Sequence, residues 1–176
     1  KHNNILTFCH EGPWDVVDHR IWGLNTDTGE AWKIRPAKQK GEMTGHEYWH
    51  ADGEMIGYHG RRPDGSMYFG HIRYDNTDEI EVSFPHLTGH IHSNDKNLIV
   101  GDGGSVIRLW KWNGTDYDGP RVLCLHNSSS KIQQVHVHPR FTADGSKIVF
   151  TSDTSGYGQV YSVDVPEFES LPKLED

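Results

Sequence analysis

A repeat of short apolar segments constrains the fold of this chain more than any other feature. The segments start at positions 5, 55, 98 and 148, so their starts are 50, 43 and 50 residues apart. Turn-forming residues precede three of the segments, as in Asp52-Gly53, Asn94-Asp95 and Asp144-Gly145. Turns of this kind between apolar runs predict β-hairpins.

Each repeat continues with further β-rich stretches. A Gly- or Asp-rich loop leads to a second stretch, at residues 20–24, 66–73, 106–112 and 159–163. A third stretch follows at residues 31–34, 80–84 and 122–125. About four strands in a period of roughly 40 to 50 residues, without a helix, are typical of a β-propeller blade. The sequence therefore predicts an all-β propeller with four-stranded antiparallel blades, and an independent β-sandwich of stacked hairpins is the alternative.

The repeats divide the chain into about three to four blades. We expect an incomplete blade at residues 1–43, blades at 44–88 and 89–131, and an incomplete last blade at 132–176. The first repeat begins at its second strand, and the last stops after its third. An open arc exposes unpaired strand edges. The prediction is therefore part of a larger propeller, whose open edges are covered by missing blades or by self-association.

Composition narrows the class of protein. A length of 176 residues fits one domain, and a net charge of −8 argues against a nucleic-acid partner. No apolar run approaches the roughly 20 residues of a membrane helix, so no membrane partner is expected. Two cysteines, Cys9 and Cys124, are expected to be buried thiols, and with no hydrophobic leader at the start they favour a cytoplasmic location.

Histidine placement suggests the chemistry. Three of the 13 histidines, His46, His90 and His138, each lie seven residues before the equivalent position of a turn. Each is expected at the start of the innermost strand of its blade, so rotation about a propeller axis would bring the three together at the central channel. The alternative is that they are merely polar residues lining that channel. Loops on the same face would bring Arg20, Arg61 and Arg62 to its mouth.

A second pattern adds metal-binding residues. His136 and His138 alternate with Val135 and Val137, which predicts that both imidazoles point to one face of a strand. Gln133 lies three residues before His136. A nitrogen- and oxygen-rich set suits a first-row divalent metal and does not distinguish manganese, iron, nickel and zinc.

Several stretches, in order along the chain, resemble oligogalacturonate lyase. They are His-Glu-Gly-Pro-Trp-Asp at 10–15 running on to 18–22, Thr-Gly-His-Glu-Tyr-Trp at 44–49, Gly-His at 89–90 with Ser-Asn at 93–94 and Gly-Asp-Gly at 101–103, and residues 133–139. The resemblance implies the C-terminal half of a seven-bladed β-propeller. It also implies a manganese-dependent lyase that cleaves short, pectin-derived galacturonides by β-elimination, so the partner would be an acidic oligosaccharide.

The resemblance also implies roles for individual residues. By motif, the manganese ligands are His90, Gln133, His136 and His138, while His46 is the catalytic base and Arg20 assists it. His92 lies where the family pattern has no ligand, although it could compete with His90 for that position. Candidate substrate-binding residues are Arg61, Arg62 and Trp49.

Each role has a structural alternative. Arg20 could pair with Asp15 or Asp18, and His46 could form a structural hydrogen bond near Glu47. Trp14 and Trp49 could belong to the core, which is the commoner use of aromatic residues. Arg61 and Arg62 could lie in a solvated loop. The alternative functions are a non-catalytic TolB-like propeller module that binds a protein or sugar, and a lyase of the same fold acting on another uronide.

Overall fold

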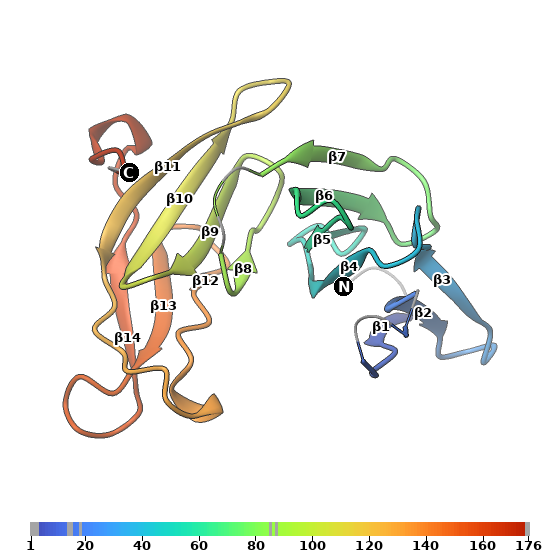
Figure 1. Cartoon of the computed structure of the whole chain (residues 1–176), viewed down its shortest axis with the longest axis horizontal. Coiled ribbons are helices and arrows are strands. Elements are labelled where there is room, and N and C mark those ends of the chain that lie inside the picture. Colours follow the sequence, from blue (N-terminus) through green and yellow to red (C-terminus); the bar gives the residue numbers. More distant parts are fainter. Residues whose placement is uncertain (1–3, 14–15, 18, 85, 87, 175–176) are drawn as a thin grey trace. The chain divides into compact units, whose positions relative to one another are not determined.

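The chain folds almost entirely into β-strands. The computed structural model describes residues 4–13, 16–17, 19–84, 86 and 88–174, and their only helices are two single-turn 3-10 helices, η1 (Gln133–Val135) and η2 (Phe168–Ser170). The strands form four antiparallel sheets, each in the order of the sequence, which agrees with the predicted blade topology (Figure 1). The residues divide into two compact units, Lys1–Pro85 and His86–Asp176.

The first unit holds two of the sheets. The three-stranded sheet contains β1 (Ile5–Cys9), β2 (Ile21–Asn25) and β3 (Ala31–Arg35), and the four-stranded sheet contains β4 (Met43–Trp49), β5 (Met55–Arg61), β6 (Met67–Arg73) and β7 (Ile80–Ser83). The central strands β5 and β6 are buried over most of their length. A core of Ile21, Ile34, Ile56, Tyr58, Tyr68 and Ile72 joins the two sheets.

The second unit repeats this plan. Its four-stranded sheet contains β8 (Ile91–His92), β9 (Leu98–Gly103), β10 (Val106–Trp112) and β11 (Tyr117–Leu125), and its three-stranded sheet contains β12 (Arg140–Phe141), β13 (Lys147–Ser152) and β14 (Gln159–Asp164). The apolar core between them is formed by Val100, Ile107, Leu109, Val137, Phe141, Ile148, Phe150, Phe168 and Leu171. After β14 the chain returns to β11, where Lys173 pairs with Arg121.

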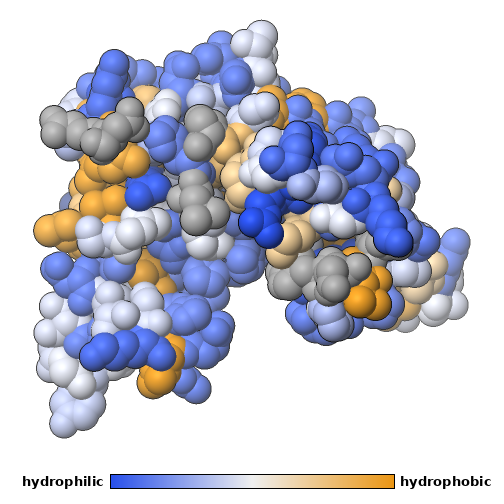
Figure 2. Space-filling view, in the orientation of Figure 1, coloured by the Kyte–Doolittle hydropathy of each residue, from blue (hydrophilic) through white to orange (hydrophobic). Residues whose placement is uncertain are grey.

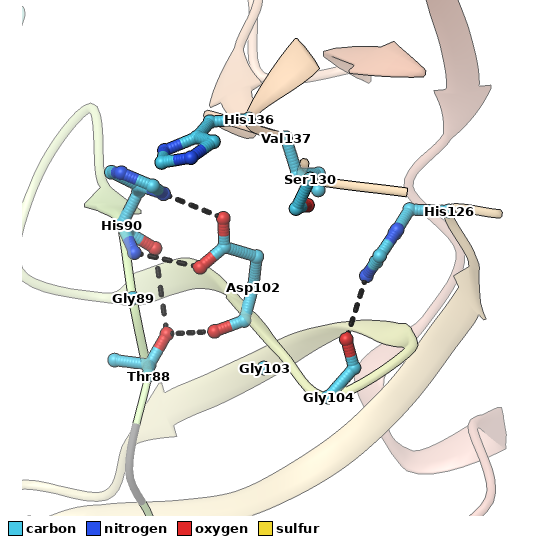
Figure 3. Close-up of a pocket in the computed structure, with 10 residues that line it drawn as sticks. All are labelled: Thr88, Gly89, His90, Asp102, Gly103, Gly104, His126, Ser130, His136 and Val137. Atoms are coloured by element: carbon cyan, nitrogen blue, oxygen red, sulfur yellow. Dashed lines mark hydrogen bonds and ion pairs between the residues drawn. The ribbon is translucent and has the colours of Figure 1, made fainter. Parts of the chain in front are cut away.

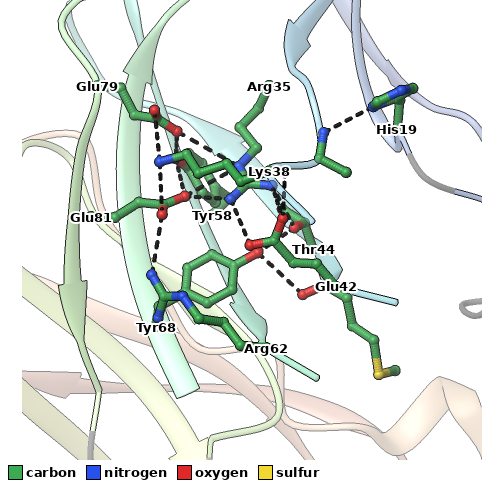
Figure 4. Close-up of polar contacts among 12 residues, drawn as sticks. His19, Arg35, Lys38, Glu42, Thr44, Tyr58, Arg62, Tyr68, Glu79 and Glu81 are labelled. Atoms are coloured by element: carbon green, nitrogen blue, oxygen red, sulfur yellow. Dashed lines mark hydrogen bonds and ion pairs between the residues drawn. The ribbon is translucent and has the colours of Figure 1, made fainter. Parts of the chain in front are cut away.

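A buried ionic cluster, which we call the Arg35 cluster, connects the two sheets of the first unit (Figure 4). Arg35 at the end of β3 donates to Glu42 in the following loop at 2.6 and 2.9 Å and to Glu81 on β7 at 2.5 Å. Lys38 and Arg62 bind the outer oxygen of Glu81 at 2.9 and 3.3 Å. Burial alone would raise the pKa of Glu42 and of Glu81, but the hydrogen bonds from Arg35 hold both below their ordinary value. The charges are therefore paired at neutral pH.

The structure corrects the strand predicted around His136 and His138. Residues 133–135 form η1, His138 has a left-handed φ of 42°, and β12 begins only at Arg140. The 3-10 turn and the positive φ are incompatible with a continuous strand. The segment nevertheless lies alongside β13, because the backbone N–H of Thr151 donates to the carbonyl of Val137 at 2.9 Å.

The surface is mainly polar, but two strands at the edges of their sheets expose apolar side chains. The face seen in Figure 2 is mainly hydrophilic, with apolar groups in separate areas. Among the described residues, β1 and β14 are each paired on one side only, and each carries exposed apolar side chains such as Phe8 and Val160. The expectation that missing blades or another copy cover these edges stays a prediction. No helix in the described ranges has the length and apolar character needed to cross a bilayer.

Candidate functional site

Three histidines predicted to bind a metal, His90, His136 and His138, lie together in the second unit, and Figure 3 shows the first two beside a pocket. His90, His136 and His138 each offer a ligand atom, and these atoms all lie within 4.8 Å of one another. The His90 ring lies 3.7 Å from that of His138 and 5.5 Å from that of His136, measured between centroids. His90 directly precedes β8, while the other two follow η1. Burial lowers the pKa of His138 below its ordinary value, helped by the neighbouring His90, which favours the neutral, ligating form.

Asp102 fixes His90. Its carboxylate accepts a hydrogen bond from His90 Nδ1 and another from the His90 backbone N–H, both at 2.7 Å. The carboxylate can accept but cannot donate, so the proton of the ring lies on Nδ1 and the lone pair on Nε2. Burial raises the pKa of Asp102, but these hydrogen bonds hold it below its ordinary value. The residue therefore supplies a fixed negative charge behind one imidazole.

The cluster opens onto a pocket of about 330 Å³, whose wall includes His90, Asp102, His126 and His136. In Figure 3 the imidazole of His126 turns away from His90 toward the carbonyl of Gly104, to which Nε2 donates at 3.0 Å. His126 is therefore part of the wall rather than a member of the His90–His136–His138 cluster.

Gln133 and His92 have different environments. Gln133 opens η1 with an exposed side chain, and its backbone carbonyl accepts a hydrogen bond from the N–H of His136 at 3.2 Å. Its role as a fourth ligand stays a prediction. His92 is buried on β8, and its Nδ1 accepts the backbone N–H of Phe141 at 3.2 Å. The cluster contains His90 and not His92.

His46, the predicted base, lies in the first unit. It is exposed within β4, at a bulge between Gly45 and Tyr48, and has a left-handed φ of 52°. Its Nδ1 lies 2.6 Å from Nε2 of His59, a buried residue on β5. When His46 donates in this bond, its Nε2 carries a lone pair that can accept a proton. The prediction that His46 joins His90 and His138 at one channel stays a prediction.

Arg20 has a partner that the sequence did not suggest. Its guanidinium is 6% exposed and donates to Glu11 at 3.3 Å, to the Gly12 carbonyl at 3.2 Å and to Cys9 Sγ at 3.2 Å. Asp15 and Asp18, the alternatives named above, lie outside the described residues, as does Trp14. The Glu11 side chain is 79% exposed, so the ion pair faces solvent on the carboxylate side.

The two cysteines are not in a disulfide and are half-buried, so the expectation of buried thiols holds only in part. Cys9 accepts its hydrogen bond from Arg20 at the solvent-facing end of β1, and this position leaves part of the thiol uncovered. Burial and the negative charge of Glu47 raise the pKa of the Cys9 thiol to about 11. Burial likewise raises the pKa of the half-buried Glu47. The thiol is therefore protonated at neutral pH and is a weak nucleophile.

The candidate substrate-binding residues lie in three environments. Arg61 is exposed at the end of β5 and donates to Met43 Sδ at 3.2 Å. Arg62 belongs to the Arg35 cluster, and its guanidinium lies 4.5 Å from the centre of the Tyr68 ring. Trp49 packs against the core of the first unit, which is the alternative use considered for it.

Sequence reasoning missed two residues, Asp102 and His59. Both lie on the strand that follows a predicted site histidine, on the partner strand in the same sheet. Asp102 comes five residues after Asn97 and His59 six residues after Gly53, so the two positions differ by one residue in the repeat alignment. Spacing alone therefore does not identify them.

Known proteins provide an independent comparison. The family model described as oligogalacturonate lyase matches residues 1–108. An oligogalacturonide lyase of Pectobacterium atrosepticum is 30% identical over 186 residues, which cover 94% of this chain and 48% of that protein. The chain thus spans about half the length of the curated lyases it matches.

Solved structures agree with this result. The oligogalacturonate lyase of Vibrio parahaemolyticus is 29% identical, with a TM-score of 0.79 over 94% of this chain and 47% of that one. An oligogalacturonate lyase in complex with manganese is 28% identical, with a TM-score of 0.78 over 93% of this chain and 46% of that one. TolB from Acinetobacter baumannii, at 16% identity and a TM-score of 0.63 over 98% of this chain and 41% of that one, shares the fold alone. This chain has the β-propeller fold and belongs to the oligogalacturonate lyase family.

Proposed function

We propose that the protein is a lyase that cleaves short galacturonides, such as digalacturonate, by metal-assisted β-elimination to unsaturated or keto uronate products. The observation that carries the proposal is the meeting of three imidazoles beside a pocket, in a chain of this family. An acidic oligosaccharide is the substrate class that the names of the related lyases support.

His90, His136 and His138 would hold a divalent cation, with Gln133 as the proposed fourth ligand. The donor set fits such an ion: three imidazole ligand atoms lie within 4.8 Å of one another, and His90 is held by a carboxylate. We propose manganese because a related lyase was solved in complex with it. When bound, the cation would stabilise negative charge that develops on the substrate carboxylate during proton removal.

His46 is the proposed base. β-Elimination removes the C5 proton beside the uronate carboxylate and expels the O4 substituent, so it needs a neutral group with a free lone pair. His46 is exposed, and when its Nδ1–H donates to His59, its Nε2 carries the lone pair that such a base needs. The bulge at this point of β4 turns the side chain out of the regular ladder.

Arginines are proposed to recognise the uronate carboxylates. Arg20 already binds a carboxylate, that of Glu11, and the exposed Glu11 side chain can leave when a substrate carboxylate takes its place. Arg61 offers an exposed guanidinium at the end of β5. Arg62 and Trp49 are the weaker candidates, because one is paired with Glu81 and the other packs on the core.

The test is product formation by the full-length protein. With digalacturonate and Mn²⁺, absorbance of the unsaturated product should rise, and a chelator should abolish the rise. His136→Ala should remove both metal binding and turnover. A metal-loaded protein that forms no product from any galacturonide would contradict the proposal, and absence of bound metal as well would favour the TolB-like binding module.

A further inference from the structure

The contacts around Asp102 form a second layer behind the metal-binding histidines. Asp102 is 7% exposed, and both of its carboxylate oxygens bind His90, one the backbone N–H and the other the ring Nδ1. Its backbone is also held: Thr88 Oγ1 and the Gly89 N–H both donate to its carbonyl, and its own N–H donates to the His90 carbonyl at 3.1 Å. The carboxylate therefore has little freedom to move.

Gly89 makes room for this arrangement. A side chain at that position would place Cβ 2.7 Å from Asp102 Oδ1, closer than real Cβ contacts allow. The absence of a side chain lets the carboxylate reach the backbone and the ring of His90 at once. The geometry is thus built from three consecutive residues, 88–90, and from the end of β9.

From these contacts we infer that Asp102 is the positioning residue of the metal centre. It fixes the Nδ1–H tautomer of His90 and directs Nε2 toward the cation. This inference rests on the proposed metal site. A carboxylate behind a ligating imidazole restricts ring rotation and increases its donor strength, and loss of such a partner typically weakens metal affinity about 10- to 100-fold.

The other unit shows that the carboxylate is not a requirement of the sheet. Beside His46 the neighbouring strand supplies the imidazole of His59, which pairs in register with Gly45 rather than with His46. A histidine near this point of a sheet therefore does not require a carboxylate partner. The Asp102 carboxylate binds both the backbone N–H and the ring of His90, and its bond to the ring is the contact that bears on metal binding.

The experiment measures Mn²⁺ affinity by the loss of the free-ion EPR signal, using the full-length protein. Asp102→Asn and Asp102→Ala should weaken binding about 10- to 100-fold. Asp144→Asn removes the same charge from an exposed turn of the same unit and should bind as the parent does. Thermal melting of each variant shows whether it is folded.

A second readout does not depend on the metal. In the metal-free parent, ¹⁵N spectra of the imidazoles should show His90 protonated on Nδ1. In Asp102→Asn the amide can donate to Nδ1, so the proton should move to Nε2, where it blocks the ligand position. A merely structural role would not move this proton.

The outcomes separate the two proposals. Variants that bind Mn²⁺ as the parent does, or a parent His90 protonated on Nε2, would overturn the positioning role and leave the proposed function standing. A parent chain that binds no Mn²⁺ would overturn the proposed metal site and the positioning role with it. If both variants unfold, the tautomer of the parent still decides.

Discussion

The two units each fix one histidine from the same repeated position, but with partners of opposite chemistry. His90 is held by the carboxylate of Asp102, whereas His46 is held by the imidazole of His59. A carboxylate makes its imidazole a stronger donor to a cation. An imidazole partner orients the ring without a fixed negative charge. One repeated position can therefore serve two purposes, depending on which side chain of the neighbouring strand contacts it.

The cores of the units differ as well. The second unit is held by an apolar cluster of nine buried residues. The first unit has a smaller apolar cluster and the buried Arg35 cluster beside it. Low pH and the removal of buried charges should therefore destabilise the first unit more than the second.

The largest expected effect is on turnover in His46→Ala. Loss of a general base typically slows a reaction by about 10²- to 10⁴-fold. We expect a fall of this size in kcat for digalacturonate with the full-length, Mn²⁺-loaded protein. His10→Ala, which changes another histidine of the same unit, is the matched control. Near-normal turnover in His46→Ala would end the assignment of the base.

Arg35→Met should destabilise the first unit. Removing one partner of a buried ion pair leaves uncompensated charge and costs about 3–5 kcal/mol. Hydrogen exchange should show loss of protection in β3 and β7, with β13 much less affected. Equal loss in both regions would show that the Arg35 cluster is not a local support.

The same cluster gives a pH dependence with a definite sign. The pKa values of Glu42 and Glu81 lie below the ordinary 4.5 in the folded chain, where Arg35 opposes the effect of burial. The two carboxylates contribute fully to the stability of the fold when the pH is above their pKa in the unfolded chain. This contribution is lost as the pH falls through their pKa values in the folded chain. Protection in β7 should thus fall in acid before protection in β13, and the reverse order would contradict this account.

His59→Ala should have a smaller effect than His46→Ala. The base stays, but its ring loses the partner 2.6 Å away, so misorientation should slow turnover by about 10- to 100-fold. KM for digalacturonate should change little, because His59 is buried. A variant with unchanged kcat would show that the His46–His59 contact has no bearing on the reaction.

The smallest effect is expected from Glu11→Gln. The Glu11 side chain is exposed, so its attraction to Arg20 is screened by solvent, and its removal should lower KM for digalacturonate by no more than a few-fold. A raised KM would mean that Glu11 helps to bind the substrate instead of competing with it.

The sequence predicted most of the fold, because the repeat sets strand positions and the turns set their pairing. The stretch 106–112 matches β10 residue for residue. The alternation at 135–138 was misread as a strand because the pattern cannot show a 3-10 turn or the left-handed backbone of His138. The alternation still predicts that His136 and His138 lie together, and the structure places both in one cluster with His90.

Partners were harder to predict than site residues. Asp102 and His59 act through contacts across a sheet, and these depend on register and on a bulge that spacing alone does not reveal. The pairing of Arg20 with Glu11 also escaped prediction, because a loop decides which of several nearby acids reaches the guanidinium. Motif spacing identifies the candidate histidines, whereas their hydrogen-bond partners are identified only in the folded structure.

The most direct test of the central claim is a side-by-side Mn²⁺ titration of His90→Ala and His46→Ala, followed by EPR. The carboxylate-backed histidine should be the ligand, so His90→Ala should lose at least about 100-fold in affinity. His46→Ala should bind Mn²⁺ as the parent does. Equal losses in both variants, or normal binding by His90→Ala, would contradict the division of roles between the two histidines.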